Sequence, residues 1–214
     1  MTDTSTEEDR PQETRDALHL ADVPDVEALR SFPVHELHLG DLLYRVHSLP
    51  PVYYGNNITS RFYLPEETGF GTCYLAEHPT PALHEAFWDR GVLTDKEMRE
   101  LQISSLSIHS EEPLQLADCT HGGASAFGVT LEMSAAEYAV THRWAIRFFE
   151  AGFRGIRFWS RHDPHRTAPC IALFARCDST EMQVLDTDTL EESEAVDTFI
   201  SIKGIKVRQV PPVP

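Results

Sequence analysis

Residues 71–85 of this 214-residue chain read GTCYLAEHPTPALHE. The segment Cys73–Ala76 is a short apolar run, which is typical of a buried strand. A proline directly behind Thr80 favours a helix that begins there, with the threonine as its N-cap. A strand, a tight turn and a helix would bring the phenol of Tyr74 and the carboxylate of Glu85 into one pocket, the first as a stacking surface and the second as an anion.

Apolar segments on both sides of this unit predict further strands. The run CIALFA at 170–175 is almost wholly apolar, which is typical of a strand in the centre of a sheet. Residues 60–63 are expected to form a short strand or an extended approach to the pocket. The remaining strands are expected at 42–46, 101–109, 114–117 and 155–160.

Few segments have the periodicity of a helix. Ser134 and Glu137 have the spacing of a capping box and predict a helix from there to about Ala151, ended by Gly152. A shorter helix is expected within 22–32. Strands that alternate irregularly with few helices indicate an α+β fold with central mixed or antiparallel sheets.

The length of the chain fits one domain with an extension at each end. Residues 1–18 are acidic and poor in apolar side chains, so we expect a disordered tail. The main domain is expected to span 19–177, and residues 178–214 to form an extension that packs on it or beside it. Within the extension, 199–207 is expected to be a hairpin around the Lys-Gly pair at 203–204.

Composition excludes several classes of function. The formal net charge of −16 argues against direct binding of nucleic acids or anionic membranes, because phosphate contacts need clustered lysines and arginines. No apolar run reaches the roughly 18 residues of a membrane span, and no secretory signal begins the chain, so we expect a cytoplasmic protein. No metal site is expected, since zinc-ligand spacing is missing among the four cysteines, at 73, 119, 170 and 177.

Three polar residues occupy positions where a structural role and a ligand-binding role compete. Arg45 ends an apolar strand, so its guanidinium needs either a carboxylate partner or a phosphate. Arg61 follows a Gly/Asn-rich loop and is either a surface residue or, beside Arg45, half of a diphosphate clamp. Ser160 either makes ordinary strand-end hydrogen bonds or positions a ligand, and no nucleophile motif surrounds it.

Tyr74 and Glu85 have structural alternatives too. Tyr74 fits an ordinary core tyrosine, and Glu85 fits a carboxylate that stabilises the first turns of a helix. In a functional role, Tyr74 would stack on a flat heterocycle. Glu85 would stabilise positive charge at an anomeric carbon, as the cleavage of a glycosidic bond requires.

Taken together, these residues resemble the RES domain family, which is named for an arginine, a glutamate and a serine. The resemblance covers about residues 38–176. It rests on pieces that occur in the family's order, namely Leu43–Val46, Ser60–Phe62, Tyr74–Ala76, Ala82–Glu85, Pro113–Asp118, Gly152–Ile156, Phe158–Arg161 and Ile171–Phe174.

The resemblance implies a fold and an activity. RES proteins resemble the ADP-ribosyltransferase fold of diphtheria toxin, and characterised members are bacterial toxins that destroy NAD by hydrolysis or phosphorolysis and are neutralised by an Xre-like antitoxin. By this resemblance Arg45 and Arg61 would hold the pyrophosphate and ribose, and Tyr74 would stack on nicotinamide. Glu85 would be the catalytic carboxylate and Ser160 would support the bound ligand. NAD would be the substrate, and no cofactor is expected.

The sequence departs from the family pattern at two places, and two alternative functions stay open. Residues 59–63 read TSRFY where members often carry a GGRWN-like segment, and Cys170 stands where an asparagine is common. The first alternative is an ADP-ribosyltransferase that modifies a macromolecule. The second is a catalytically degenerate RES domain that acts as a binding or regulatory protein. The oligomeric state is open, and a homo-oligomer is compatible with the sequence.

Overall fold

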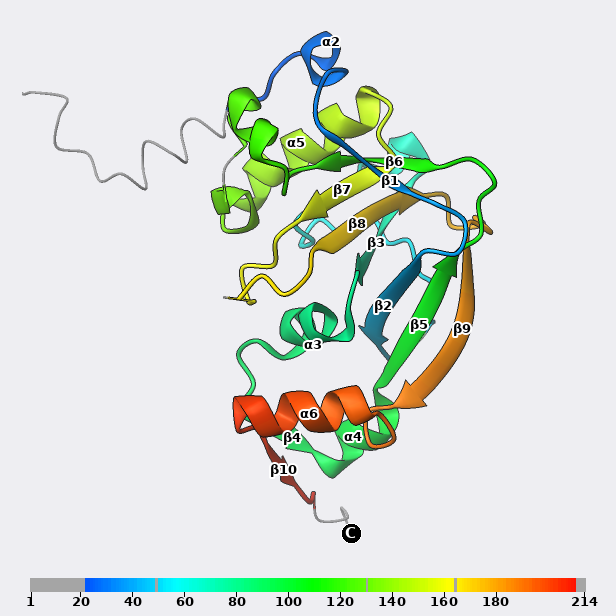
Figure 1. Cartoon of the computed structure of the whole chain (residues 1–214), viewed down its shortest axis with the longest axis vertical. Coiled ribbons are helices and arrows are strands. Elements are labelled where there is room, and N and C mark those ends of the chain that lie inside the picture. The colour runs from blue at the N-terminus through cyan, green and yellow to red at the C-terminus, as the bar shows by residue number, and fades with distance from the viewer. Residues whose placement is uncertain (1–21, 49, 130, 164, 211–214) are drawn as a thin grey trace, which may run out of the picture.

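The computed structural model describes residues 22–48, 50–129, 131–163 and 165–210. Most of the described strands form one mixed sheet, drawn as arrows in Figure 1, in which β6 and β7 run parallel and the other neighbours antiparallel. The predicted α+β class is confirmed. In spatial order the strands are β1 (Val34–Leu37), β6 (Leu114–Asp118), β7 (Gly155–Phe158), β8 (Cys170–Ala175), β3 (Gly71–Ala76), β2 (Leu42–His47), β5 (Gln102–Ile108) and β9 (Met182–Thr189).

Helices flank this sheet, and a small parallel pair of strands lies below it in Figure 1. No helix among the described residues combines the length and the apolarity needed to cross a membrane. The pair consists of β4 (Val92–Thr94) and β10 (Lys206–Arg208). The helices are α2 (Val26–Leu29), α3 (Pro79–Phe87), α4 (Asp95–Glu100), α5 (Tyr138–Glu150) and α6 (Glu194–Lys203), with 3₁₀ turns η2 (Glu66–Thr68), η3 (Gly122–Phe127) and η4 (Leu131–Ser134).

The sheet is nearly divided in two between β3 and β2. β3 pairs with β8 along its whole length, and β2 pairs with β5 in the same way. β2 and β3 themselves share the single pair Tyr44–Ala76. The two halves therefore separate beyond this point, and Figure 1 shows α3 in the space beside the separation. β8 is buried at every residue and lies between β7 and β3, which confirms its predicted central place.

The unit at 71–85 folds as the predicted strand, turn and helix. The predicted cap at Thr80 is wrong, because the N-cap residue is His78, whose Nδ1 accepts a hydrogen bond from the Thr80 N–H at 3.2 Å. Pro79 and Pro81 lie in the first turn, where a proline removes no intrahelical hydrogen bond.

The long aromatic helix begins later than predicted and ends where predicted. Residues 131–134 form η4, and α5 begins only at Tyr138, with Glu137 in the N-cap position. At the other end, Ala151 is the C-cap and Gly152 has a φ of 97°. Gly152 therefore takes the left-handed position that commonly follows a helix, as its sequence context predicts.

The C-terminal segment is more ordered than its sequence indicates. The predicted hairpin at 199–207 is wrong, because Phe199 lies in α6 and Gly204, with a φ of 67°, follows that helix instead of joining two strands. β10 then pairs with β4, which lies far away in the sequence. The same segment supplies β9, the edge strand beside β5. The acidic tail expected at residues 1–18 falls outside the described residues.

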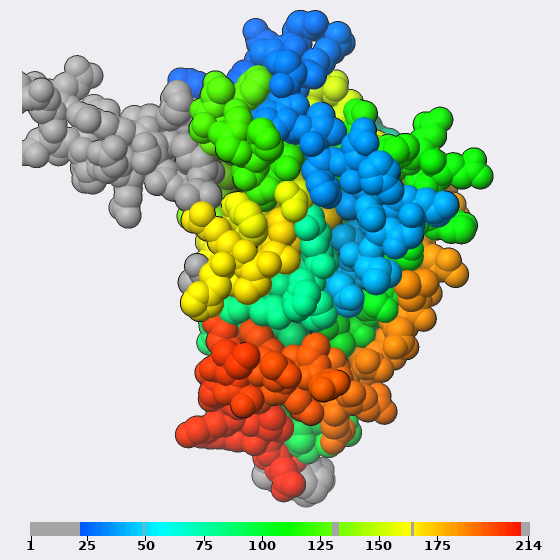
Figure 2. All heavy atoms as spheres, viewed as in Figure 1, coloured from blue at the N-terminus to red at the C-terminus, as the bar shows by residue number. Residues whose placement is uncertain are grey.

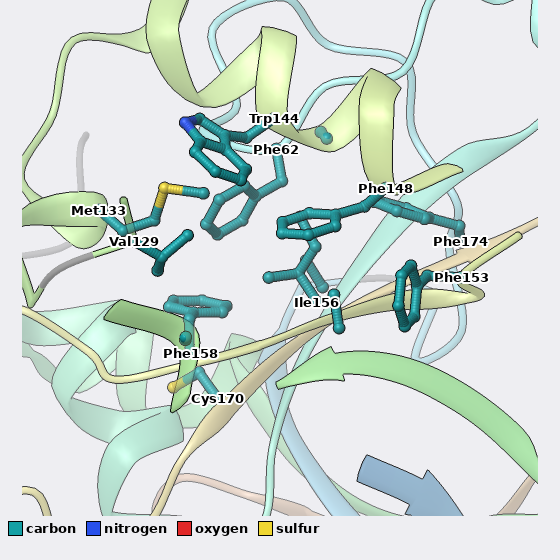
Figure 3. Close-up of a cluster of buried hydrophobic side chains, with 14 of the residues drawn as sticks. Phe62, Val129, Met133, Trp144, Phe148, Phe153, Ile156, Phe158, Cys170 and Phe174 are labelled. Carbon is teal, nitrogen blue, oxygen red and sulfur yellow. The ribbon is translucent and has the colours of Figure 1, made fainter. Parts of the chain in front are cut away.

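Three apolar clusters hold these elements together. The largest lies between α5 and the sheet, where Trp144 and Phe148 point toward Ile156 and Phe158 of β7 (Figure 3). A second cluster covers the opposite face of β3 and includes Cys73 and Leu43, Leu75, Leu106 and Leu173. A third joins α3 to α4 and α6 through Leu83, Phe87, Met98, Val196 and Phe199.

The α5 cluster gives a direct test of stability. Phe148 is fully buried and makes edge-on contacts with Phe32 and Phe153, at centroid distances of 4.8 and 5.7 Å. Phe148→Ala should lower the free energy of unfolding by about 3–5 kcal/mol, because it removes a buried ring and leaves a cavity. Denaturant unfolding measures this change. Arg143→Ala, at an exposed position of the same helix, is the control, and equal losses in the two variants would contradict the prediction.

Candidate active site

Two hollows meet where β2 and β3 separate, and Tyr74, Glu85 and Phe158 line both of them. Each has a volume of about 270 Å³. We call the first the arginine hollow, because its other walls include Arg61, Trp88, Tyr138, Arg161 and His162. We call the second the apolar hollow, because its other walls are mainly Tyr44, Val46, Leu75, Ala82, Ala86 and Cys170, with Arg45.

A hydrogen bond across the fold fixes the Glu85 carboxylate. Ser160, just beyond the end of β7, donates its hydroxyl hydrogen to Glu85 Oε1 on α3. The His162 N–H donates in turn to Ser160 Oγ at 3.0 Å. Ser160 is only 4% exposed, whereas Glu85 is exposed and reaches both hollows. The segment after β7 lies directly against α3 in Figure 2.

Tyr74 stands between the two hollows and is held by its hydroxyl group. The Tyr74 Oη accepts a hydrogen bond from the Phe62 N–H at 2.7 Å. Burial raises the pKa of this phenol well above its usual value, despite the opposing effect of the Phe62 N–H, so the ring is neutral at physiological pH. The ring is thus a fixed, uncharged wall of the site.

The segment at 60–63 forms a turn instead of the expected strand or extended approach. The backbone carbonyls of this turn accept hydrogen bonds from side chains, whereas those of a strand would accept them from the backbone of a neighbouring strand. The Phe62 carbonyl accepts from Thr72 Oγ1 at 2.8 Å, and the Arg61 carbonyl accepts from Thr141 Oγ1 at 2.6 Å. These bonds tie the turn to β3 and to α5, and they place the Arg61 side chain at the site.

Arg61 lies in the arginine hollow with its guanidinium against the start of α5. Its Nη1 donates to the Ala136 carbonyl at 2.8 Å, and its Cζ lies 5.2 Å from the centre of the Tyr138 ring. Burial, and then the neighbouring charge of Arg161, lower the pKa of Arg61. Arginine stays charged through such a shift, so the hollow holds a fixed positive charge close to Glu85.

Arg45 is not brought to the same place. It lines the apolar hollow, but its Nη1 donates to the Pro51 carbonyl at 2.9 Å and to Cys73 Sγ at 3.4 Å. Successive side chains of a strand point to opposite faces, so Cys73 lies on the other face of β3 from Tyr74. The Arg45 guanidinium therefore lies behind the sheet, away from Arg61, and the structure does not join the two in a clamp.

Residues 42–191, from the first residue of β2 to just beyond β9, match the RES domain. The chain belongs to the RES domain family. A chain of the crystal structure of the M. tuberculosis MbcT–MbcA toxin–antitoxin complex has the same fold, with a TM-score of 0.59 and 12% sequence identity, over 87% of this chain and 97% of that one. No curated protein sequence matches the chain.

Trp88, Arg161 and His162 line the arginine hollow of this RES domain, and sequence reasoning assigned none of them a role in substrate binding. Trp88 stacks on His162, with ring centres 4.4 Å apart and planes 15° apart. Arg161 Nε donates to His162 Nε2 at 3.0 Å, and Arg161 Cζ lies 5.8 Å from the centre of the Trp88 ring. Trp88, the C-cap residue of α3, follows Glu85 by three residues. This spacing places the two side chains on the same face of a helix, and it is the feature of the sequence that could have linked Trp88 to the site.

The imidazole in this stack is held neutral. Burial first, and then the charges of Arg161 and Arg61, lower the pKa of His162 to about 4. A neutral ring keeps Nε2 as an acceptor for Arg161. It also stacks on the indole without bringing a third positive charge into the hollow.

Acid should therefore destabilise this RES domain through His162. In the unfolded chain its pKa is about 6.5, so between about pH 6.5 and pH 4 the unfolded state binds more protons and the free energy of unfolding falls as the pH is lowered. His162→Gln should reduce this pH dependence when unfolding is measured at pH 7 and at pH 4.5. His165→Gln, at an exposed position nearby, should keep it. The same dependence in both variants would contradict the assignment.

Proposed function

We propose that this RES domain cleaves the bond between nicotinamide and ribose in NAD and transfers the ADP-ribosyl group to water or phosphate. The observation that carries the proposal is the Glu85 carboxylate, fixed by Ser160 at the boundary of an apolar and a cationic hollow. NAD carries a flat nicotinamide ring, which leaves as an uncharged product, and a doubly charged diphosphate. Binding both groups requires one apolar and one cationic environment.

The proposed chemistry follows from the placement of two side chains, Tyr74 and Glu85. Nicotinamide enters the apolar hollow and lies against the neutral ring of Tyr74. The C–N bond breaks with both electrons on the nitrogen, so nicotinamide leaves uncharged and the ribose carries the positive charge. Glu85 faces this forming cation and stabilises it, as a fixed carboxylate does in glycoside cleavage. Water then adds to the ribose carbon and loses a proton, which gives ADP-ribose.

The arginines take different roles in this proposal. Arg61 faces the substrate from the arginine hollow and holds the diphosphate next to the reacting ribose. Arg45 supports the site from behind, because its bonds to the Pro51 carbonyl and to Cys73 brace the loop after β2 against β3. Ser160 positions Glu85 through the hydroxyl group that it donates.

Loss of the Glu85 charge tests the reaction. Glu85→Gln should lower the rate of NAD consumption by at least about 100-fold, because it removes a preorganised charge at the forming cation. Glu150→Gln, which alters an exposed carboxylate at the end of α5, is the matched control. Chromatography of the products of labelled NAD identifies ADP-ribose or its phosphorylated form. Full turnover by Glu85→Gln would contradict the proposal, and label on a macromolecule would favour an ADP-ribosyltransferase.

The biological role proposed for this reaction is that of a toxin held in check by an antitoxin protein. Membership of the RES family supports it, and so does the fold shared with a chain of a toxin–antitoxin complex. NAD loss stops growth, so an enzyme of this kind needs a partner that blocks it.

Expression in bacteria tests this role. The wild-type chain alone should arrest growth and deplete cellular NAD, whereas Glu85→Gln should do neither at the same protein level. Growth counts and an NAD assay on the same cultures provide the measurement. Equal arrest by both proteins would show that toxicity does not depend on the proposed chemistry.

A further inference from the structure

We infer that Trp88 and Arg161, together with Arg61, form the subsite for the adenosine diphosphate half of the ligand. Trp88 stacks on the adenine, and the two guanidiniums hold the diphosphate. The inference rests on the proposed function, and it assigns the arginine hollow a ligand class, a nucleoside diphosphate, that can be tested without turnover.

The charges of the arginine hollow support a diphosphate. The protein has a formal net charge of −16, yet neither Arg61 nor Arg161 forms an ion pair with any carboxylate that the structure describes. Their observed acceptors are uncharged, namely the Ala136 carbonyl and the His162 ring. Two guanidiniums that line one hollow and repel each other are stabilised by an anion between them, and their planar forks suit phosphate oxygens.

The aromatic surface of the hollow supports a purine. Trp88 is 55% exposed although it is a large aromatic residue, and its indole lines the hollow. His162 stacks near-parallel on one face of this indole, so a base would stack on the part of the indole that stays exposed. Every base has a π-face that stacks on an aromatic side chain in this way. Arg161 lies beside the same indole, so the base and its diphosphate would have neighbouring partners.

The position of Glu85 fixes the orientation of the ligand. The reacting ribose must lie at Glu85 and Tyr74, on the boundary of the two hollows. With nicotinamide in the apolar hollow, the diphosphate extends to Arg61 and Arg161. In the reverse orientation the diphosphate would lie in the apolar hollow, where the guanidinium of Arg45 is bound behind the sheet. The first orientation therefore pairs each chemical group with a matching wall.

The subsite is built by the same two elements that fix the carboxylate. Trp88 is the C-cap residue of α3, the helix that carries Glu85. Arg161 follows Ser160 directly, in the segment beyond β7. A ligand that bridges Trp88 and Arg161 would hold these elements at their observed separation, so binding of the diphosphate half would preserve the bond between Ser160 and Glu85.

Binding of ADP to the full-length protein, measured by calorimetry, tests the subsite. Arg161→Gln and Trp88→Ala should each weaken ADP binding by about tenfold or more, since each removes a charged hydrogen bond or a stacking surface. Trp88→Phe should restore most of the affinity, because it keeps an aromatic face. Arg143→Gln, at an exposed arginine of α5 outside the hollow, should bind ADP like the wild type.

Kinetics separate binding from a general loss of structure. Both variants should raise KM for NAD by about tenfold and leave kcat within about twofold, because they touch only the diphosphate half. Cleavage of nicotinamide riboside, which lacks that half, should be unchanged. Unchanged affinity for ADP in both variants, no binding of ADP to the wild type, or an equal loss with the riboside would overturn the inference. Predicted ADP binding without NAD cleavage would refute the proposed function and leave the subsite standing.

Discussion

β2 and β3 share one residue pair, Tyr44–Ala76, and the site depends on this near-separation of two strands. Directly after that pair, the Glu77 N–H bonds to the Pro169 carbonyl, so the chain leaves β2 and stays with the segment before β8. α3 then crosses the space beside the opening. A fully paired β2–β3 ladder would close the sheet at this point, and Glu85 and Tyr74 would have no hollow to face.

The helix that carries the carboxylate is itself held from the C-terminal side. Val196 and Phe199 of α6 pack with Leu83 and Phe87 of α3, and Phe199 meets the buried ring of His84 edge-on at 5.1 Å. Glu85 is the next residue after His84, so α6 packs on the part of α3 that carries the carboxylate. α6 lies beyond the residues that match the RES domain, which end at 191. In this chain, contacts from outside the matched residues therefore support the helix that carries Glu85.

The two places where the sequence differs from the pattern expected of the family lie at the hollows. Residues 59–63 form the turn that places Arg61 in the arginine hollow, and Cys170 lines the apolar hollow at the start of β8. Burial raises the pKa of the Cys170 thiol well above its usual value, so this wall is uncharged.

The sequence by itself determined the features that local pattern controls. Apolar runs located β2, β3 and β8, and the unit at 71–85 joined Tyr74 to Glu85 because a strand, a turn and a helix fold within fifteen residues. Tertiary structure alone decided which face of β2 carries the Arg45 guanidinium, which strand pairs with β10, and that Arg161 and Trp88 lie together. These outcomes depend on contacts between distant segments, and periodicity along the chain carries no information about which segments meet.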